Sequence, residues 1–178
     1  MVNQFDDEIA RMDELEQEES PGVHEAVSLN EPLSELNLQT PIILPSGATV
    51  KKAVKQLKIT SFGCVLIEDQ GRLIGILTER DILQKITGRG LNLDQEIVDT
   101  FMTPDPEYLK MEDPIVYALN KMYVGGFRHV PLVDDNKNPV GLVSLVDIVH
   151  HISDFFSNEV LNLPTKPQRK GFKRPEGG

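Results

Sequence analysis

An internal repeat is the feature of this 178-residue sequence that most restricts the folds it can adopt. At an offset of 66 residues, the segment LIEDQGRLIGILTERDIL (66–83) pairs with LVDDNKNPVGLVSLVDIV (132–149), with five identities and eight close exchanges among the eighteen positions. Upstream, at an offset of 65, Val50 and Ile115 each begin a set of apolar residues with the 0, 3, 4, 7 spacing of an amphipathic helix. The chain is therefore predicted to contain two copies of one structural unit of roughly 60 residues.

Each copy has the pattern of an entering strand, a helix, two short strands and a second helix. The sequence predicts the helices at about 49–59 and 79–86 in the first copy, and at about 114–123 and 145–156 in the second. The second copy is one residue longer, and we assign the extra residue to the segment between Phe127 and Leu132. Because one unit cannot bury its apolar face alone, we expect an α/β (α+β) fold in which two β-α-β-β-α repeats pack with pseudo-two-fold symmetry.

The net charge of −10 belongs to one end of the chain. Residues 1–36 contain 11 of the 28 acidic residues and one of the 18 basic residues, whereas the last fifteen residues contain five basic residues and one acidic residue. Charged segments without a periodic apolar face are typical of disordered chain. The predicted organisation is an acidic, mostly disordered arm, a first repeat, a linker, a second repeat and a basic, flexible tail, at residues 1–36, 37–90, 91–103, 104–158 and 159–178.

Several functional classes are not expected from the composition and motifs. The single cysteine, Cys64, lies in an apolar run, which favours burial in the core over a disulfide or a reactive thiol. The sequence has no run of about 18 apolar residues and no signal peptide, which favours a cytoplasmic protein without a membrane segment. His150 and His151 are adjacent and point about 100° apart on a helix, so no metal site is predicted. We expect neither an enzyme nor, with the acidic arm beside the basic tail, a nucleic-acid-binding protein.

The motifs of the two copies resemble those of a known family. GRLIGILTERDIL is followed one repeat later by NPVGLVSLVDIV, FMTPDPEYL opens the second copy, and GGFRHVPLVDD lies between these segments. They are similar to a pair of CBS (cystathionine β-synthase) domains, the Bateman module, over residues 37 to about 158. The resemblance implies a non-catalytic regulatory module that usually forms a homodimer. It also implies two related clefts between the repeats, many of which bind AMP, ADP, ATP or S-adenosylmethionine, with no other cofactor required.

One candidate site combines residues of both repeats. Thr78 and Asp81 form a T-x-x-D element at a strand-to-helix junction, where they can cap the helix or, through the carboxylate, accept both hydrogens of a ribose diol. The resemblance implies the ribose contact and places basic residues of the other repeat at the phosphate. Here these residues are Arg128 and His129, with Arg80 as a further candidate. A surface ion pair for Arg128 and a half-buried strand position for His129 are the alternative interpretations.

The second candidate site is predicted to be weaker. It uses Ser144 and Asp147, with Thr40 and Ile42 beside the base, but repeat 1 has only a glycine and a cysteine, at 63–64, where repeat 2 has its arginine and histidine. A charge-assisted arginine contact contributes about 1.5–3 kcal/mol. We therefore expect one cleft to bind a phosphorylated ligand and the other to be weak or empty.

The adenine pocket of the first site is the least specified part of the prediction. The resemblance places the segment 105–108, which includes Glu107 and Tyr108, at the base, and Gly126 leaves room for close approach of a ligand. Packing at the edge of a sheet explains the same residues without a ligand.

Two hypotheses for function follow. The leading hypothesis is a regulatory module that binds an adenosine nucleotide between its repeats and signals occupancy to an unidentified partner protein. The alternative is a protein-protein interaction module with vestigial clefts, in which the arm, the helix end at 155–161 and the tail recognise the partner.

Overall fold

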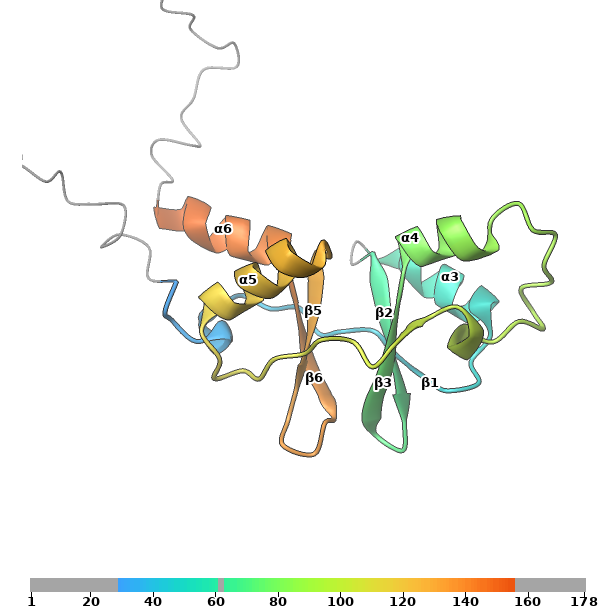
Figure 1. Ribbon diagram of the computed structural model, residues 1–178, viewed down its shortest axis with the longest axis horizontal. Coiled ribbons are helices and arrows are strands. Elements are labelled where there is room, and N and C mark those ends of the chain that lie inside the picture. The colour runs from blue at the N-terminus through green and yellow to red at the C-terminus, as the bar shows by residue number, and fades with distance from the viewer. Residues whose placement is uncertain (1–28, 61–62, 156–178) are drawn as a thin grey trace, which may run out of the picture.

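The computed structural model describes residues 29–60 and 63–155 (Figure 1). The predicted disorder of the acidic arm up to residue 28 and of the tail from residue 159 therefore lies outside the described residues, as does the helix end from residue 156. Within the described ranges, two similar halves lie side by side, and the longer helices of both halves lie at one end of the hairpins (Figure 1).

The first half follows the predicted order of elements. Its helices and strands are β1 (Ile43–Pro45), α3 (Val50–Ile59), β2 (Cys64–Asp69), β3 (Arg72–Thr78) and α4 (Glu79–Asp81), which continues as the π-helical turn η2 (Ile82–Ile86). Helix α3 begins where the Lys52 amide donates to the Thr49 hydroxyl, and it buries Val50, Ala53 and Leu57. The apolar spacing read from the sequence is therefore the face that packs on the sheet.

The second half repeats this order with a reduced entering strand. Its elements are α5 (Ile115–Gly125), β5 (His129–Val133), β6 (Pro139–Ser144) and α6 (Leu145–Phe155). The predicted entering strand consists of one parallel bridge, between Leu109 and Leu132. Helix α5 ends at Gly126, whose φ of 67° is the left-handed conformation that glycine adopts most easily at a helix end.

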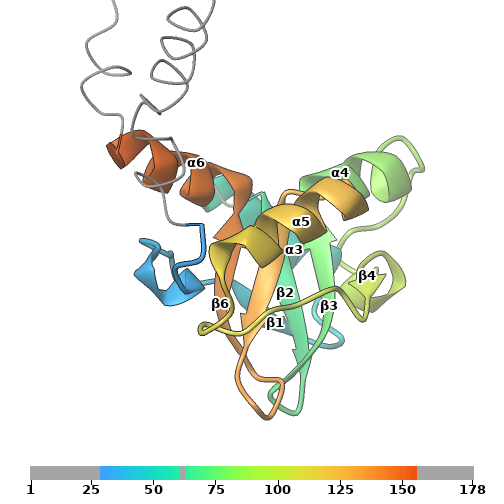
Figure 2. The same ribbon diagram turned by 60° about the vertical axis from the view of Figure 1, so that its left-hand side comes forward.

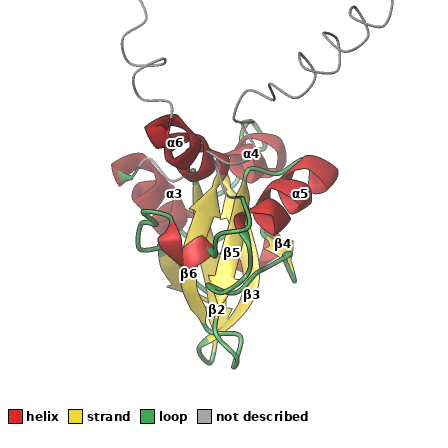
Figure 3. Cartoon of the chain, turned by 90° about the vertical axis from the view of Figure 1, so that its left-hand side faces the viewer, coloured by secondary structure: helices red, strands yellow, loops and turns green. Residues whose placement is uncertain are grey.

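The two halves meet through their hairpins, as the views from the side show (Figures 2 and 3). Cys64, Leu66 and Ile76 of the first half form a buried cluster with Val133 and Leu142 of the second half. Each half also has its own core between its hairpin and its helices. This packing confirms the predicted pair of repeats with pseudo-two-fold symmetry.

Each repeat begins with a short segment that packs on the other repeat. The 3₁₀ turn η1 (Leu33–Glu35) lies on repeat 2, where Leu33 is fully buried, and the equivalent turn η3 (Val98–Thr100) lies on repeat 1, where Val98 is fully buried. The strand β4 (Thr103–Pro104) follows η3 and pairs with β3. We call 29–38 and 94–104 the entry segments.

These entry segments correct two predicted boundaries. The arm was expected to extend to residue 36, but from residue 29 the chain contributes to the core of repeat 2. Residues 91–103 were expected to be a linker, but most of them pack on repeat 1 and bond the start of α3, where the Val50 amide donates to the Glu96 carbonyl. The spacing of apolar residues in the sequence gives no indication that each entry segment packs on the other repeat, because this packing depends on contacts between segments far apart in the chain.

The extra residue of repeat 2 lies in its hairpin turn, so its predicted position between Phe127 and Leu132 is wrong. Val65 lies opposite Leu77, and Val130 lies opposite Val143. The first strands of the two hairpins therefore align at an offset of 65 residues and the second strands at 66. A strand alternates between two faces, and only the offset of 65 superimposes its core-facing residues.

Candidate functional site

A cleft of about 390 Å³ lies between the two repeats. Most of its walls come from three places: the start of α4, the loop before β5, and β4 with the residues that follow it. The residues that line it are Gly63, Ile76, Thr78, Glu79, Arg80, Asp81, Thr103, Asp105, Pro106, Glu107, Phe127, Arg128 and His129. The structure thus brings together in one cleft the five residues predicted to bind ribose and phosphate.

Thr78 and Asp81 form a complete capping box at the start of α4. The Asp81 carboxylate accepts hydrogen bonds from the Thr78 amide at 2.9 Å and from the Thr78 hydroxyl at 2.6 Å, while the Asp81 amide donates to that hydroxyl at 3.1 Å. Two of these bonds end on Oδ2 of Asp81 and the third is donated by its backbone amide, so Oδ1 takes part in none of them. The capping interpretation is therefore correct, and the carboxylate still faces the cleft.

The other oxygen of Asp81 contacts Lys85, which the sequence analysis did not identify. Lys85 Nζ lies 2.8 Å from Asp81 Oδ1 and donates to the Phe101 carbonyl at 2.7 Å. Burial alone would raise the pKa of the Asp81 carboxyl, but hydrogen bonds from Lys85 and Thr78 outweigh it and hold the pKa below its ordinary value. Asp81 is therefore an ionised acceptor at neutral pH. Its i, i+4 spacing from Lys85 is the signal that could have revealed the pair.

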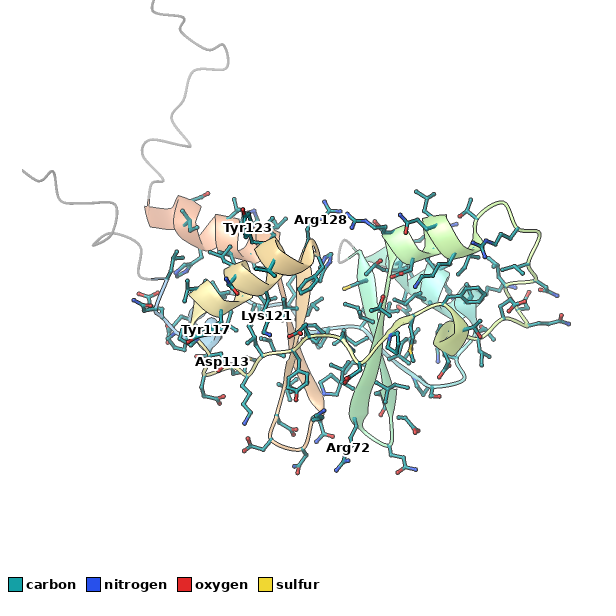
Figure 4. The ribbon with its side chains drawn as sticks, in the orientation of Figure 1. Arg72, Asp113, Tyr117, Lys121, Tyr123 and Arg128 are labelled. Atoms are coloured by element: carbon teal, nitrogen blue, oxygen red, sulfur yellow. The ribbon has the colours of Figure 1, made fainter. Side chains whose placement is uncertain are left out.

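Arg128 and His129 lie where the loop before β5 meets that strand, whereas Arg80 lies in α4. Figure 4 shows Arg128 beside the boundary between the two halves. The Arg128 carbonyl accepts from the Leu145 amide, just as the Gly63 carbonyl accepts from the Glu79 amide in repeat 1, so Arg128 and Gly63 are structural equivalents. Gly63 has a φ of 67°, so a side chain at this position would be strained.

The phosphate candidates differ in their surroundings. Within the described ranges, neither Arg80 nor Arg128 takes part in an ion pair, so the surface ion pair considered for Arg128 is not formed there. His129 is partly buried and lies opposite Ser144 at the start of β5, as the half-buried alternative predicts, and it also lines the cleft. Glu79 and Asp105 add negative charge to the same walls.

The predicted adenine residues separate into two groups. Glu107 lines the cleft, and its carboxylate pairs with Lys121 of α5. Tyr108 is not among the lining residues; it packs on the cluster between the hairpins, with Lys137 Nζ 5.1 Å from the centre of its ring. Gly126 is also outside the lining and ends α5.

Thr103 is a lining residue that the sequence analysis did not predict; it lies in the entry segment of repeat 2 and reaches the cleft because β4 pairs with β3 of the preceding repeat. Asp105 and Pro106 follow β4, belong to the segment 105–108 that the resemblance places at the base, and line the cleft. Phe127 and Ile76 add apolar surface. No local pattern could have placed the entry segment there, because the exchange joins residues far apart in the chain.

The residues predicted for the second site do not line this cleft. Ser144 and Asp147 form the same capping arrangement, in which the Ser144 amide and hydroxyl each donate to the Asp147 carboxylate at 2.7 Å. Ile42 packs against the core of repeat 1, and Thr40 is exposed before β1. The repeat symmetry therefore preserves the acceptor of the second site but not the cations beside it.

Cys64 has a structural position, as predicted. Its side chain is buried between the hairpins. Burial, with a further contribution from the Glu79 charge, raises the pKa of the Cys64 thiol to about 12. The thiol is therefore protonated at neutral pH, and Cys64 acts as a small apolar residue.

Comparison with known proteins shows the family of the chain. The family model of the CBS domain matches residues 33–88 and 97–154, which is more than half of the chain. The chain belongs to the CBS domain family. Both matched ranges begin within the entry segments, in agreement with the structural boundaries of the repeats.

Similar sequences occur in both eukaryotes and archaea. The CBS domain-containing protein CBSCBSPB3 of Arabidopsis thaliana is 31% identical over 114 residues, which are 64% of this chain and 20% of that protein. An uncharacterized 17.7 kDa protein of Acidianus ambivalens is 31% identical over 113 residues, which are 63% of this chain and 67% of that protein. The CBS repeats thus span about one fifth of the length of the plant relative.

Solved structures of CBS domain pairs have the same fold. A CBS domain protein of Pyrobaculum aerophilum, complexed with AMP, aligns with a TM-score of 0.62 and 26% identity, and the alignment covers 71% of this chain and 98% of that one. The CBS domain pair of protein MJ0100, in complex with 5′-methylthioadenosine and S-adenosyl-L-methionine, aligns with a TM-score of 0.60 and 25% identity over 72% of this chain and 97% of that one. Both relatives bind an adenosine-containing ligand.

Metal ligation and membrane insertion find no support in the described part of the chain. No group of three or more His, Cys, Asp or Glu side chains there is arranged to hold a metal ion. Between residues 29 and 155, leaving out 61–62, none of the helices has the length and apolar character needed to cross a bilayer.

Proposed function

We propose that this CBS domain pair is a non-catalytic regulatory module that binds an adenosine nucleotide between its repeats and signals occupancy to a partner protein. The observation that carries the proposal is the meeting of Asp81 and Thr78 of repeat 1 with Arg128 and His129 of repeat 2 in one cleft. AMP, ADP, ATP and S-adenosylmethionine are the candidate ligands, and no further cofactor is required.

The chemistry of the cleft suits such a ligand. A volume of about 390 Å³ lies within the range of small-molecule sites, roughly 300–1,000 Å³. The ionised Asp81 is an acceptor for a ribose diol, and Arg80 and Arg128 are donors for a phosphate. Ile76 and Phe127 supply apolar surface for a base. The AMP complex of the Pyrobaculum relative supports the same ligand class.

A thermal shift panel with AMP, ADP, ATP and S-adenosylmethionine tests the proposal. A ligand at about 100 times its Kd adds roughly 2.7 kcal/mol, which raises the Tm of a domain of this size by several degrees. The shift should disappear in Asp81→Asn and persist in the matched variant Asp147→Asn. Arg128→Ala should weaken binding of the phosphorylated ligands about ten-fold or more, because it removes a charge-assisted contact. No shift with any of the four ligands at millimolar concentration would contradict the proposal.

We propose in addition that the helical end of the molecule binds a second copy of the chain. Four large apolar side chains are exposed there at equivalent positions of the two repeats: Ile59 and Val124, and Leu83 and Val149. Because this surface has an internal pseudo-two-fold axis, two copies can dock through the same residues in a closed dimer. The expected dimer contact of the helix end at 155–161 concerns residues beyond those whose side chains are described.

Light scattering after gel filtration tests the homodimer. The wild-type chain should have the mass of two copies, and Leu83→Glu combined with Val124→Glu should have the mass of one, because two buried charges would oppose association. Val140→Glu on the hairpin is the control, since Val140 is also exposed but lies away from the helices. A monomeric wild-type chain would exclude the homodimer without affecting the ligand proposal.

Signalling to a partner is tested by capture of binding proteins with and without nucleotide. Capture that depends on AMP and is lost in Arg128→Ala supports a nucleotide-regulated module. Capture that depends neither on AMP nor on Arg128, but is lost when residues 1–28 are removed, supports the interaction module with vestigial clefts. The deletion stops at residue 28 because residues from 29 onward belong to the core of repeat 2.

A further inference from the structure

Lys85 connects two walls of the cleft although it does not line it. Its Nζ lies 2.8 Å from Asp81 Oδ1 and 2.7 Å from the Phe101 carbonyl oxygen. Asp81 belongs to the wall at the start of α4, and Phe101 stands in the entry segment, two residues before Thr103 of the opposite wall. One ammonium group therefore fixes the carboxylate relative to the wall that faces it.

The carboxylate of Asp81 is held on both oxygens as a result. Thr78 donates to Oδ2 through its amide and its hydroxyl, and Lys85 donates to Oδ1. The side chain of Asp81 is only 12% exposed, so it has little freedom to turn. An ionised carboxylate has about four acceptor positions, and three are used. One position, on Oδ1, is left for a ligand hydroxyl, so the carboxylate held in this way accepts one hydrogen of a ribose diol rather than both.

Repeat 2 differs at the equivalent of Lys85. That residue is His151, whose Nε2 lies 3.2 Å from Oε2 of Glu31 in the entry segment of repeat 1. The Asp147 carboxylate accepts hydrogen bonds from the Ser144 amide and hydroxyl. The two capping boxes are alike in geometry, and the basic residue one turn later contacts an entry segment in both repeats, but it is a lysine paired with Asp81 in repeat 1 and a histidine in repeat 2.

We propose that Lys85 is a positioning residue of the nucleotide cleft, which presents the Asp81 carboxylate to the ribose and sets its distance from the entry-segment wall. This inference rests on the proposed function. Lys85 acts through Asp81 and Phe101 and does not touch the ligand. The other charged or titratable side chains that line the cleft are Glu79, Arg80, Asp105, Glu107, Arg128 and His129.

The test compares Lys85→Met with the wild-type chain in two measurements. Methionine keeps most of the length and packing of the lysine stem but removes the ammonium group. The Kd of AMP at pH 7.5, from calorimetric titration, should rise by up to about ten-fold, because an Asp81 carboxylate that Lys85 no longer holds must be ordered when the ribose binds. The pKa of Asp81, from NMR titration of its carboxyl without ligand, should rise, because burial remains and the Lys85 hydrogen bond is lost.

Two variants separate positioning from general stability. Lys85→Arg keeps the positive charge and should restore most of the AMP affinity and the low pKa of Asp81. His151→Met changes the equivalent residue of repeat 2 and should alter neither measurement. AMP binding to the wild-type chain with an unchanged Kd in Lys85→Met would overturn the positioning role alone. An unchanged Asp81 titration would also overturn it, whereas absence of AMP binding to the wild-type chain would overturn the proposed function and this role with it.

Discussion

The two repeats share a scaffold and differ where that scaffold meets the cleft. Many of their buried residues correspond: Val65 with Val130, and the entry-segment residues Leu33 with Val98, are all fully buried. Their exposed residues near the cleft do not correspond in character. Arg128 stands where repeat 1 has Gly63, and Arg80 stands where repeat 2 has a valine.

This contrast separates the positions that folding constrains from the positions at the cleft. A buried position must stay apolar and similar in volume, because overpacking or a cavity costs several kcal/mol. A position at the cleft can change without unfolding the repeat, since its side chain is exposed. Duplication therefore gives two equivalent acceptors, Asp81 and Asp147, while the cations gather at one of them.

The largest loss of stability is expected from substitutions in the entry segments, which test whether the buried residues of the two repeats are equivalent. Leu33→Ala should lower the free energy of unfolding by about 2–5 kcal/mol, because Leu33 is fully buried in the core of repeat 2 although it precedes repeat 1 in the chain. Chemical denaturation followed by circular dichroism measures this. Val98→Ala removes the equivalent contact of repeat 1 and should also destabilise, by less, because fewer atoms are lost.

Glu35→Ala is the control for the entry segment, since Glu35 is exposed in the same turn. It should change stability by no more than about 0.5 kcal/mol. An equally small effect of Leu33→Ala would show that the segment does not hold repeat 2 together in solution, and the arm would then extend beyond residue 28.

A smaller loss of stability is expected when the glycine that the two repeats share, Gly75 in repeat 1 and Gly141 in repeat 2, is replaced. A methyl group at Gly75 would overlap Met102 Sδ, whereas at Gly141 the nearest atom would be Leu132 Cδ1 at 3.1 Å. Gly75→Ala should therefore cost about 1–3 kcal/mol through overpacking, and Gly141→Ala should cost less. Thermal unfolding of both variants measures the difference.

The double variant Gly75→Ala with Met102→Ala identifies the cause. Removing the Met102 side chain makes room for the new methyl group, so the double variant should lose less stability than the sum of the two single variants. Additive losses would mean that the contact with Met102 is not what makes Gly75 necessary.

The sequence predicted the scaffold well because its signals are local. The helix α3, the two hairpins and both capping boxes follow from apolar spacing, turn residues and the T-x-x-D and S-x-x-D elements. The ribose and phosphate candidates were also brought into one cleft, since the family resemblance supplied the pairing of repeats.

The errors concern contacts between distant segments and details of register. The exchange of entry segments moved two boundaries, and it brought Thr103 to the cleft. The identity of Leu66 with Leu132 favoured the wrong offset for a strand, although the burial pattern requires the other one. Tyr108 and Gly126 were placed at the base by analogy, and their positions depend on hairpin packing and helix termination instead.

The smallest expected loss of stability comes from replacing the aspartate of a capping box, and its size and pH dependence distinguish the two boxes. Asp81→Asn should lower the free energy of unfolding by about 1–2 kcal/mol at pH 7, because a cap and the Lys85 ion pair are weakened. The pKa of Asp81 is lower in the folded protein than its ordinary value of about 3.9. The wild-type carboxylate therefore stabilises fully above that value, and its contribution is lost as the pH falls through the lower folded pKa.

Denaturation of wild type and Asp81→Asn at pH values from about 7 to 2.5 measures this loss. The difference between the two proteins should be constant near neutral pH and should shrink at the acidic end, where Asp81 is protonated. Asp147→Asn is the matched variant in repeat 2, and it should cost less at pH 7, because a histidine, His151, replaces there the lysine that pairs with Asp81. Equal costs for the two variants would mean that Lys85 adds nothing to the capping box, and the main difference between the repeats would then be confined to Arg80 and Arg128.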